Sequence, residues 1–224
     1  MDKRSFEQEM EWFRQLQWTQ RLAIFHNLNE YAKKGQIVFT GSSLMEQFPL
    51  LELSQGLNLP CHLYNRGIGG FVTAQLLEHL DVCVYELEPS HIFINIGTND
   101  MNGPEYSQDG LVSRYEDILT SIQSKLPKAM IHVLAYYPVN PDARVVPEQF
   151  KETFRHRSNQ AIISANKRIE ALADKMGARF HNLNQGLTDD KGRLKEAYTM
   201  DGMHMYANGY KKVFENLLPI LRGL

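Results

Sequence analysis

The chain has 224 residues, which is enough for one large α/β domain and short for two. Its 43% hydrophobic and 22% charged residues are ordinary values for a globular protein, and its formal net charge is −2. The lysines and arginines are scattered along the chain instead of clustered, which argues against a nucleic-acid partner.

The sequence also indicates a cellular compartment. The two cysteines, Cys61 and Cys83, are too few for a disulfide framework. The charged N-terminus lacks the apolar stretch of a signal peptide, and no segment approaches the ~20 apolar residues of a membrane span. We therefore expect a cytoplasmic protein without a membrane span.

Residues 5–33 have the pattern of a helix, broken at most once. Its apolar side chains lie near one face: Phe6, Met10, Phe13, Leu16, Trp18, Leu22, Phe25 and Leu28. The polar face mixes glutamate with arginine, which disfavours a membrane-surface helix. We predict an N-terminal helical arm, residues 1–34, that packs either on the domain or on a partner subunit, so a homodimer is left open.

The chain beyond Gly35 changes pattern and alternates strands with helices. Short β-branched or aromatic segments bounded by glycine, proline or asparagine predict strands at 36–41, 61–68, 90–97, 130–139 and 178–184. Apolar residues spaced by three and four predict helices at 77–87, 111–126, 158–176 and 208–218, the last ended or kinked by Pro219. This alternation predicts one α/β domain, residues 35–224, with a five-stranded parallel sheet covered on both faces.

Such a sheet places its chemistry in the loops beyond the carboxyl ends of its strands. The first of these loops contains "GSSL" from Gly41, the second "NRGIGG" from Asn65 and the third "GTND" from Gly97. The long fifth loop ends in a segment that contains Asp201 and His204. A hydroxyl nucleophile, a histidine with a carboxylate, and backbone and amide donors are the groups that acyl transfer needs.

Each of these signals also has a structural interpretation. Ser43 could be a helix N-cap, and the glycines could serve tight turns. Asn99 and Asp100 could form a turn or a cap, and an Asp-x-x-His segment is often on the surface. The combination of all four segments at successive strand ends favours the catalytic interpretation.

The four segments, in this order, resemble the sequence blocks of the SGNH (GDSL-type) hydrolases, a superfamily of serine esterases and lipases. The resemblance covers residues 36 to about 222 and is nearest to bacterial platelet-activating-factor acetylhydrolase-like esterases. It implies a flavodoxin-like three-layer sandwich.

The resemblance also implies roles for five residues. Ser43 matches the nucleophile, His204 the general base and Asp201 the residue that orients the base. Gly70 matches the backbone oxyanion donor and Asn99 the side-chain donor. By position alone Gly67 and Gly69 compete for the glycine role, and the spacing from Asn65 to Gly70 favours Gly70.

One residue departs from the family pattern. The family usually has an aspartate before its nucleophile, where this chain has Ser42. We interpret Ser42 as a structural serine whose hydroxyl can still accept one backbone hydrogen bond. Arg66 is interpreted as a surface arginine, with an anionic substrate group as the alternative contact. The long segment 136–154 is predicted to shape a pocket with Tyr136, Tyr137, Val139 and Val145.

The sequence thus predicts a serine esterase that cleaves a carboxylic ester of a small molecule through a Ser-His-Asp triad and an acyl-enzyme. No histidine pair has metal-ligand spacing, so neither a metal nor a cofactor is expected. A short acyl group is favoured because no inserted cap domain could enclose a long one, while thioester hydrolysis and carbohydrate deacetylation stay open. The alternative is a weakly active or inactive binding or assembly protein on the same scaffold.

Overall fold

The computed structural model describes the backbone of residues 3–224 and the side chains from residue 8 onward, so Met1, Asp2 and the Phe6 side chain of the predicted arm lie outside the described residues. A parallel five-stranded sheet forms the centre of the molecule, with strand order β2-β1-β3-β4-β5. Its strands are β1 (Ile37–Gly41), β2 (Leu63–Gly67), β3 (His91–Asn95), β4 (Met130–Leu134) and β5 (Arg179–His181). The prediction of a flavodoxin-like fold is confirmed.

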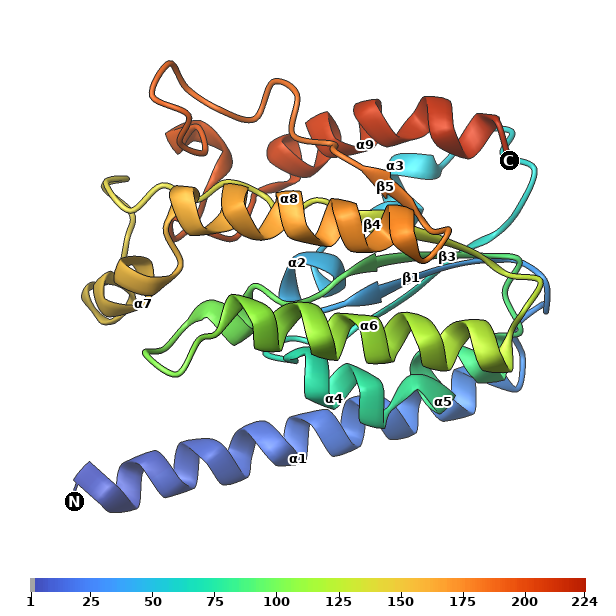
Figure 1. The fold of residues 1–224 in the computed structure, drawn as a ribbon, viewed down its shortest axis with the longest axis horizontal. Coiled ribbons are helices and arrows are strands. Elements are labelled where there is room, and N and C mark those ends of the chain that lie inside the picture. The colour runs from blue at the N-terminus through green and yellow to red at the C-terminus, as the bar shows by residue number, and fades with distance from the viewer. Residues whose placement is uncertain (1–2) are drawn as a thin grey trace.

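Helices cover both faces of the sheet (Figure 1). On one face lie α4 (Thr73–Glu78), α5 (Leu80–Cys83), α6 (Gln108–Lys125) and α8 (Asn159–Lys175), with α1 (Lys3–Asn29) packed outside α5. The other face carries α2 (Ser43–Glu46), α3 (Leu50–Ser54) and α9 (Ala207–Arg222). The remaining elements are η1 (Tyr85–Leu87), η2 (Asn99–Met101), η3 (Glu148–Phe150), α7 (Lys151–His156) and η4 (Glu196–Tyr198).

The central strands are apolar on both faces because both faces are covered. All five residues of β1 are buried. On the α9 side, Phe39 of β1 stacks on Phe93 of β3, with ring centroids 4.7 Å apart. On the opposite side, Ile92 and Ile94 of β3 join the core formed with α6. These two cores hold the loops at the strand ends in fixed positions.

The strand order reverses at β1, which lies between β2 and β3. The chain crosses one face of the sheet from β1 to β2 and the other face from β2 to β3, so the loops beyond β1 and β3 diverge. Parallel sheets place their ligand crevice at such a switch point. The segments that contain Ser43 and Asn99 follow these two strands directly.

Three predicted helices differ from the observed ones. The arm helix is continuous and ends at Asn29 instead of residue 33, and among its described side chains Trp18 and Phe25 pack on the body. The segment 77–87 is split into α4, α5 and η1, because His79 leaves helical dihedrals at φ −114° and ψ 23°. Pro219 does not end α9, which continues to Arg222 since the buried Leu221 anchors its last turn.

Arg66 is buried, with 6% of its surface exposed, so the prediction of a surface or substrate-binding arginine is wrong. Its Nε donates to Asn29 Oδ1 at 2.9 Å, and its guanidinium lies 4.9 Å from the centroid of the Phe25 ring. Burial lowers the pKa of Arg66. The arginine thus connects the end of α1 to β2. The hydrogen bond between its guanidinium and the Asn29 amide gives both buried polar groups a partner.

Candidate active site

Ser43 lies at the point where β1 turns into α2. Gly41 ends the strand with φ +150°, and a Cβ at this position would lie 2.0 Å from the carbonyl oxygen of Asn95. Only a glycine lets the end of β1 lie this close to β3. The chain then turns so that Ser43 becomes the first residue of α2, with its side chain half-buried.

The hydroxyl of Ser43 meets a histidine that is 161 residues later in the sequence. Its Oγ lies 2.8 Å from His204 Nε2. On the other side of the ring, His204 Nδ1 lies 2.6 Å from Asp201 Oδ2. The structure therefore brings the predicted nucleophile, base and orienting carboxylate into one hydrogen-bonded chain.

Asp201 and His204 are held by a short loop instead of a helix. An antiparallel bridge pairs Thr199 with Met205 and closes this loop. Asp201 Oδ1 accepts hydrogen bonds from the backbone N–H groups of Met203 at 3.0 Å and His204 at 2.8 Å. The same carboxylate thus organises the loop with one oxygen and orients the imidazole with the other.

The electrostatics of Asp201 favour the carboxylate. Burial raises the pKa of Asp201, but the hydrogen bonds from the His204 side chain and from the backbone of His204 and Met203 outweigh it, so the pKa lies below its ordinary value. An ionised carboxylate can only accept hydrogen bonds. His204 Nδ1 therefore holds the proton, which leaves the lone pair of Nε2 directed at the Ser43 hydroxyl.

The three glycines at the end of β2 and in the turn that follows it differ in the hydrogen bonds of their N–H groups. The N–H of Gly67 donates to Asn65 Oδ1 at 2.9 Å, and that of Gly69 donates to Glu46 Oε2 at 2.9 Å. Within the described part of the chain, the N–H of the exposed Gly70 has no acceptor. Gly70 is therefore the glycine of this turn whose N–H is free for a ligand.

Asn99 follows β3 at the start of η2. Its Nδ2 donates one hydrogen to the carbonyl oxygen of Phe71 at 3.0 Å, just beyond the glycine turn. An amide nitrogen carries two hydrogens, so a second donor is left. The next residue, Asp100, accepts from the backbone N–H of Thr73 at 3.0 Å and from Arg114, which ties α4 and α6 to this loop.

Ser42 is structural, but it does not act as predicted. Its backbone N–H donates to the carbonyl oxygen of Asn95 at 3.3 Å. Its side chain stands at the N-cap position of α2, yet its Oγ is buried and has no hydrogen-bond partner among the described residues. The prediction that this hydroxyl accepts a backbone hydrogen bond is wrong, because the N–H groups of Met45 and Glu46 donate to the backbone carbonyl of Ser42 instead.

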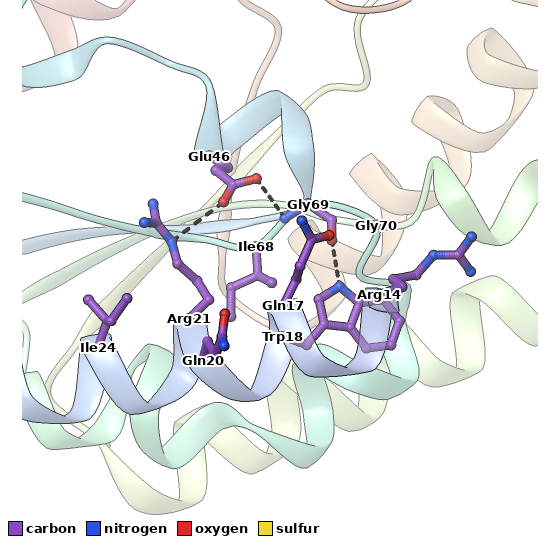
Figure 2. A pocket seen from close by; sticks show the side chains of 10 residues that line it. All are labelled: Arg14, Gln17, Trp18, Gln20, Arg21, Ile24, Glu46, Ile68, Gly69 and Gly70. Carbon is purple, nitrogen blue, oxygen red and sulfur yellow. Dashed lines mark hydrogen bonds and ion pairs between the residues drawn. The ribbon is translucent and has the colours of Figure 1, made fainter. Parts of the chain in front are cut away.

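The segment 136–154 contributes less to a pocket than predicted. Tyr137 and Val139 are each 1% exposed and belong to the core, so the prediction that they line a pocket is wrong, and Val145 is exposed. Tyr136 is equally buried but borders a cavity of about 370 Å³ beside α8, whose lining does not include Ser43. A cavity of about 470 Å³ lies elsewhere, between α1 and the glycine turn (Figure 2). No sequence pattern indicates this cavity beyond the place of Trp18 on the apolar face of the arm.

Among the side chains of residues 8–224, no group of three histidine, cysteine, aspartate or glutamate residues is arranged to hold a metal ion. No helix in the same range combines the length and the apolar character needed to cross a membrane.

Comparison with known proteins places this geometry in a family. The sequence pattern of the GDSL-like lipase/acylhydrolase family matches residues 51–212. The chain belongs to the GDSL-like lipase/acylhydrolase family. The matched range includes Gly70, Asn99, Asp201 and His204, while Ser43 precedes it. The predicted resemblance is thus confirmed, and this GDSL-like hydrolase is an enzyme that acts on esters.

The relatives of this GDSL-like hydrolase agree with that assignment. It is 25% identical over 193 residues to platelet-activating factor acetylhydrolase IB subunit alpha1 of Bos taurus, covering 86% of this chain and 77% of the relative. A structure from Streptococcus pneumonia, provisionally described as a platelet activating factor, has a TM-score of 0.87 and 30% identity, over 98% of this chain and 100% of the other. A GDSL-like lipase from Bacteroides thetaiotaomicron shares the fold, with a TM-score of 0.73 and 22% identity over 90% and 97% of the two chains.

Proposed function

We propose that this GDSL-like hydrolase cleaves a short-acyl carboxylic ester by a Ser-His-Asp mechanism through an acyl-enzyme. The observation that carries the proposal is the hydrogen-bonded chain from Ser43 Oγ to His204 Nε2 and from His204 Nδ1 to Asp201 Oδ2. A serine hydroxyl is a weak nucleophile until a neighbouring base takes its proton, and this geometry supplies that base.

In the first half of the reaction, Ser43 Oγ attacks the ester carbonyl carbon while its proton moves to His204 Nε2. Asp201 stabilises the resulting imidazolium without taking its proton. The carbonyl oxygen becomes an oxyanion, for which the free N–H of Gly70, the second amide hydrogen of Asn99 and the N–H of Ser43 at the start of α2 are the donors. The intermediate collapses, and the leaving alcohol takes the proton from His204.

In the second half, water attacks the acyl-enzyme. His204 Nε2 takes one proton from that water as its oxygen bonds to the acyl carbon, and the same donors hold the new oxyanion. When this intermediate collapses, Ser43 leaves and regains the proton from His204. One ester and one water thus yield one acid and one alcohol, and the enzyme returns to its starting state.

Two observations support a short acyl group. The chain folds as one α/β unit in which the loops beyond the strands are packed, and no inserted domain stands over the sheet edge (Figure 1). The name of the Bos taurus relative denotes removal of an acetyl group. A cytoplasmic location, a homodimer, and the division into an arm and a domain stay predictions.

The test compares two adjacent serines. Ser43→Ala should abolish hydrolysis of p-nitrophenyl acetate, because it removes the nucleophile. Ser42→Ala should keep measurable activity, since the Ser42 hydroxyl contacts nothing polar. An inactive Ser42→Ala beside an active Ser43→Ala would contradict the assignment.

A series of substrates from p-nitrophenyl acetate to p-nitrophenyl decanoate tests the length of the acyl group. A rise of kcat/KM along the series would contradict the short-acyl proposal. Wild-type protein that hydrolyses no ester would favour the binding or assembly alternative.

A further inference from the structure

The N-terminal arm contacts the glycine turn that contains Gly70. Trp18 of α1 donates its indole Nε1–H to the carbonyl oxygen of Gly69 at 2.7 Å, across 51 residues of sequence (Figure 2). The same indole packs edge-on against Phe71, with ring centroids 5.3 Å apart. It also faces Gly70 so closely that a Cβ there would lie 3.4 Å from the ring. The arm is thus in direct contact with the residues on both sides of the proposed oxyanion donor.

A second side chain holds the same glycine from the other side. The N–H of Gly69 donates to Glu46 Oε2 at 2.9 Å. Glu46 is the last residue of α2, the short helix that begins at Ser43. Its other oxygen, Oε1, lies 3.5 Å from Nε of Arg21 on α1 (Figure 2). Gly69 is therefore fixed at its N–H by the helix that contains the nucleophile and at its carbonyl by the arm.

The carbonyl of Gly69 and the N–H of Gly70 belong to one planar peptide group. In a trans peptide these two bonds point in opposite directions within the plane. A donor that holds the carbonyl toward α1 therefore turns the N–H of Gly70 away from α1. The direction of this N–H is set by the hydrogen bond from Trp18.

The need for such a restraint follows from the residues on both sides of the peptide. Gly69 and Gly70 lack a Cβ, and Gly70 adopts φ +82°, so sterics alone do not keep the peptide plane in one orientation. Rotation of the plane would replace the N–H donor by a carbonyl oxygen, which would repel an oxyanion. An oxyanion donor acts best when its direction is fixed before the reaction begins.

We propose that Trp18 and Glu46 are positioning residues that lock the Gly69–Gly70 peptide with the Gly70 N–H directed at the reacting oxygen, so that the arm takes part in catalysis. The proposal rests on the proposed function, in which the N–H of Gly70 stabilises the oxyanion. Trp18 lies in α1 and Glu46 in α2, and both precede the range that matches the family.

Trp18→Phe is the central test, because it keeps an aromatic ring against Phe71 and removes the N–H donor together with part of the indole. Trp12→Phe is its matched control, since Trp12 lies on the same helix with 65% of its surface exposed. A neutral hydrogen bond of about 0.5–1.5 kcal/mol corresponds to about a two- to tenfold change. Trp18→Phe should lower kcat on p-nitrophenyl acetate by about that factor with KM little changed, and Trp12→Phe should change neither.

Glu46 provides an independent variant if Trp18→Phe folds poorly. Glu46→Ala removes the acceptor of the Gly69 N–H and should lower kcat at least as much as Trp18→Phe. Glu46→Gln keeps a side-chain oxygen for that N–H and should recover most of the loss. Equal losses in Glu46→Ala and Glu46→Gln would instead show that the ion pair with Arg21 matters, which would overturn the role of Glu46.

A short-chain trifluoromethyl ketone inhibitor shows whether Trp18 positions the oxyanion donor or only stabilises the fold. The adduct of this ketone with serine places an oxyanion where the reaction intermediate has one. Its affinity should fall in Trp18→Phe by the same factor as kcat/KM. A lower Tm with unchanged kcat and unchanged ketone affinity would overturn the proposal, as would a change confined to KM. An active Ser43→Ala variant would overturn the proposed function itself, whereas an inactive one beside a normal Trp18→Phe would overturn only the positioning role.

Discussion

His204 and His132 each stand in the middle of three hydrogen-bonded side chains, but their partners differ in kind. His204 lies between the hydroxyl of Ser43 at 2.8 Å and the carboxylate of Asp201 at 2.6 Å. His132 of β4 lies between two other imidazoles. Its Nε2 is 3.1 Å from His91 Nδ1, and its Nδ1 is 2.8 Å from His181 Nε2.

The difference in partners gives the two histidines opposite electrostatics. Burial, together with the like charges of the neighbouring His181, His91 and Arg179, lowers the pKa of His132 to about 3. Its ring also stacks on Phe93, with centroids 4.2 Å apart, so it has no route to a reactant. A carboxylate, in contrast, stabilises the imidazolium that forms beside it. The partner, and not the residue type alone, makes a histidine a usable base.

Asp201→Asn should have the largest effect, because it gives His204 a neutral partner like those of His132. An amide nitrogen at this position would donate to Nδ1 and favour the tautomer whose proton faces Ser43. We expect kcat to fall by about 10⁴ while the protein stays folded. Steady-state kinetics and the Tm of the variant check this. Near-normal activity would show that another acid or a backbone carbonyl orients His204.

Asn99→Ala should have an intermediate effect and tests the other half of the site. Negative charge develops on the substrate carbonyl oxygen only as the transition state forms. Loss of the Asn99 donor should therefore affect turnover more than substrate binding. We expect kcat to fall by about 10²–10³ with KM little changed.

Asn99→Asp and thermal unfolding complete that test. Asn99→Asp should be at least as damaging as Asn99→Ala, because a carboxylate would repel the oxyanion. A lower Tm together with a normal kcat in Asn99→Ala would reduce Asn99 to a structural role, namely its hydrogen bond to the Phe71 carbonyl.

The smallest effect on activity, and a distinct effect on stability, is expected from His132. Its pKa of about 3 in the folded protein is below the ~6.5 of an unfolded chain, so below pH ~6.5 the unfolded state binds more protons. The contribution of this group to the free energy of unfolding is fully present above pH ~6.5 and decreases as the pH falls toward about 3. The wild-type Tm should therefore fall between about pH 7.5 and about pH 5.

His132→Phe is the matched variant for that measurement. It keeps a ring against Phe93 and should have a lower Tm at neutral pH, because His91 and His181 lose their hydrogen-bond partner. Its Tm should depend less on pH than that of the wild type, and its kcat at neutral pH should be unchanged. Parallel Tm profiles for the two proteins would contradict the role of His132 in acid instability.

The sheet and the main site residues could be predicted from the sequence because each is encoded locally. A strand needs only a short apolar segment between turn residues, and Ser43, Gly70 and Asn99 follow their strands within a few residues. The Asp-x-x-His spacing marks the other pair at the end of the long segment after β5. The chain of contacts between Ser43, His204 and Asp201 then follows from the parallel sheet, which brings the strand ends to one edge.

The remaining features depend on pairs of residues far apart in the sequence. The contact of Trp18 with Gly69 spans 51 residues, and that of Arg66 with Asn29 spans 37. Helical periodicity reports which side chains face the core, but it does not report a dihedral break such as that at His79. An apolar pattern also cannot separate a pocket wall from the core, which is why the predicted environment of Tyr137 and Val139 is wrong.

The most direct test of the account is where a fluorophosphonate binds the wild-type enzyme. Such a probe reacts with an activated serine, and the hydrogen-bonded chain from Ser43 to Asp201 is the proposed source of that activation. Mass spectrometry of the digested adduct should find the phosphonyl group on Ser43 and on no other residue, in proportion to the loss of esterase activity. A fully inactivated enzyme with the probe on Ser42 or elsewhere, and with Ser43 unmodified, would contradict the account.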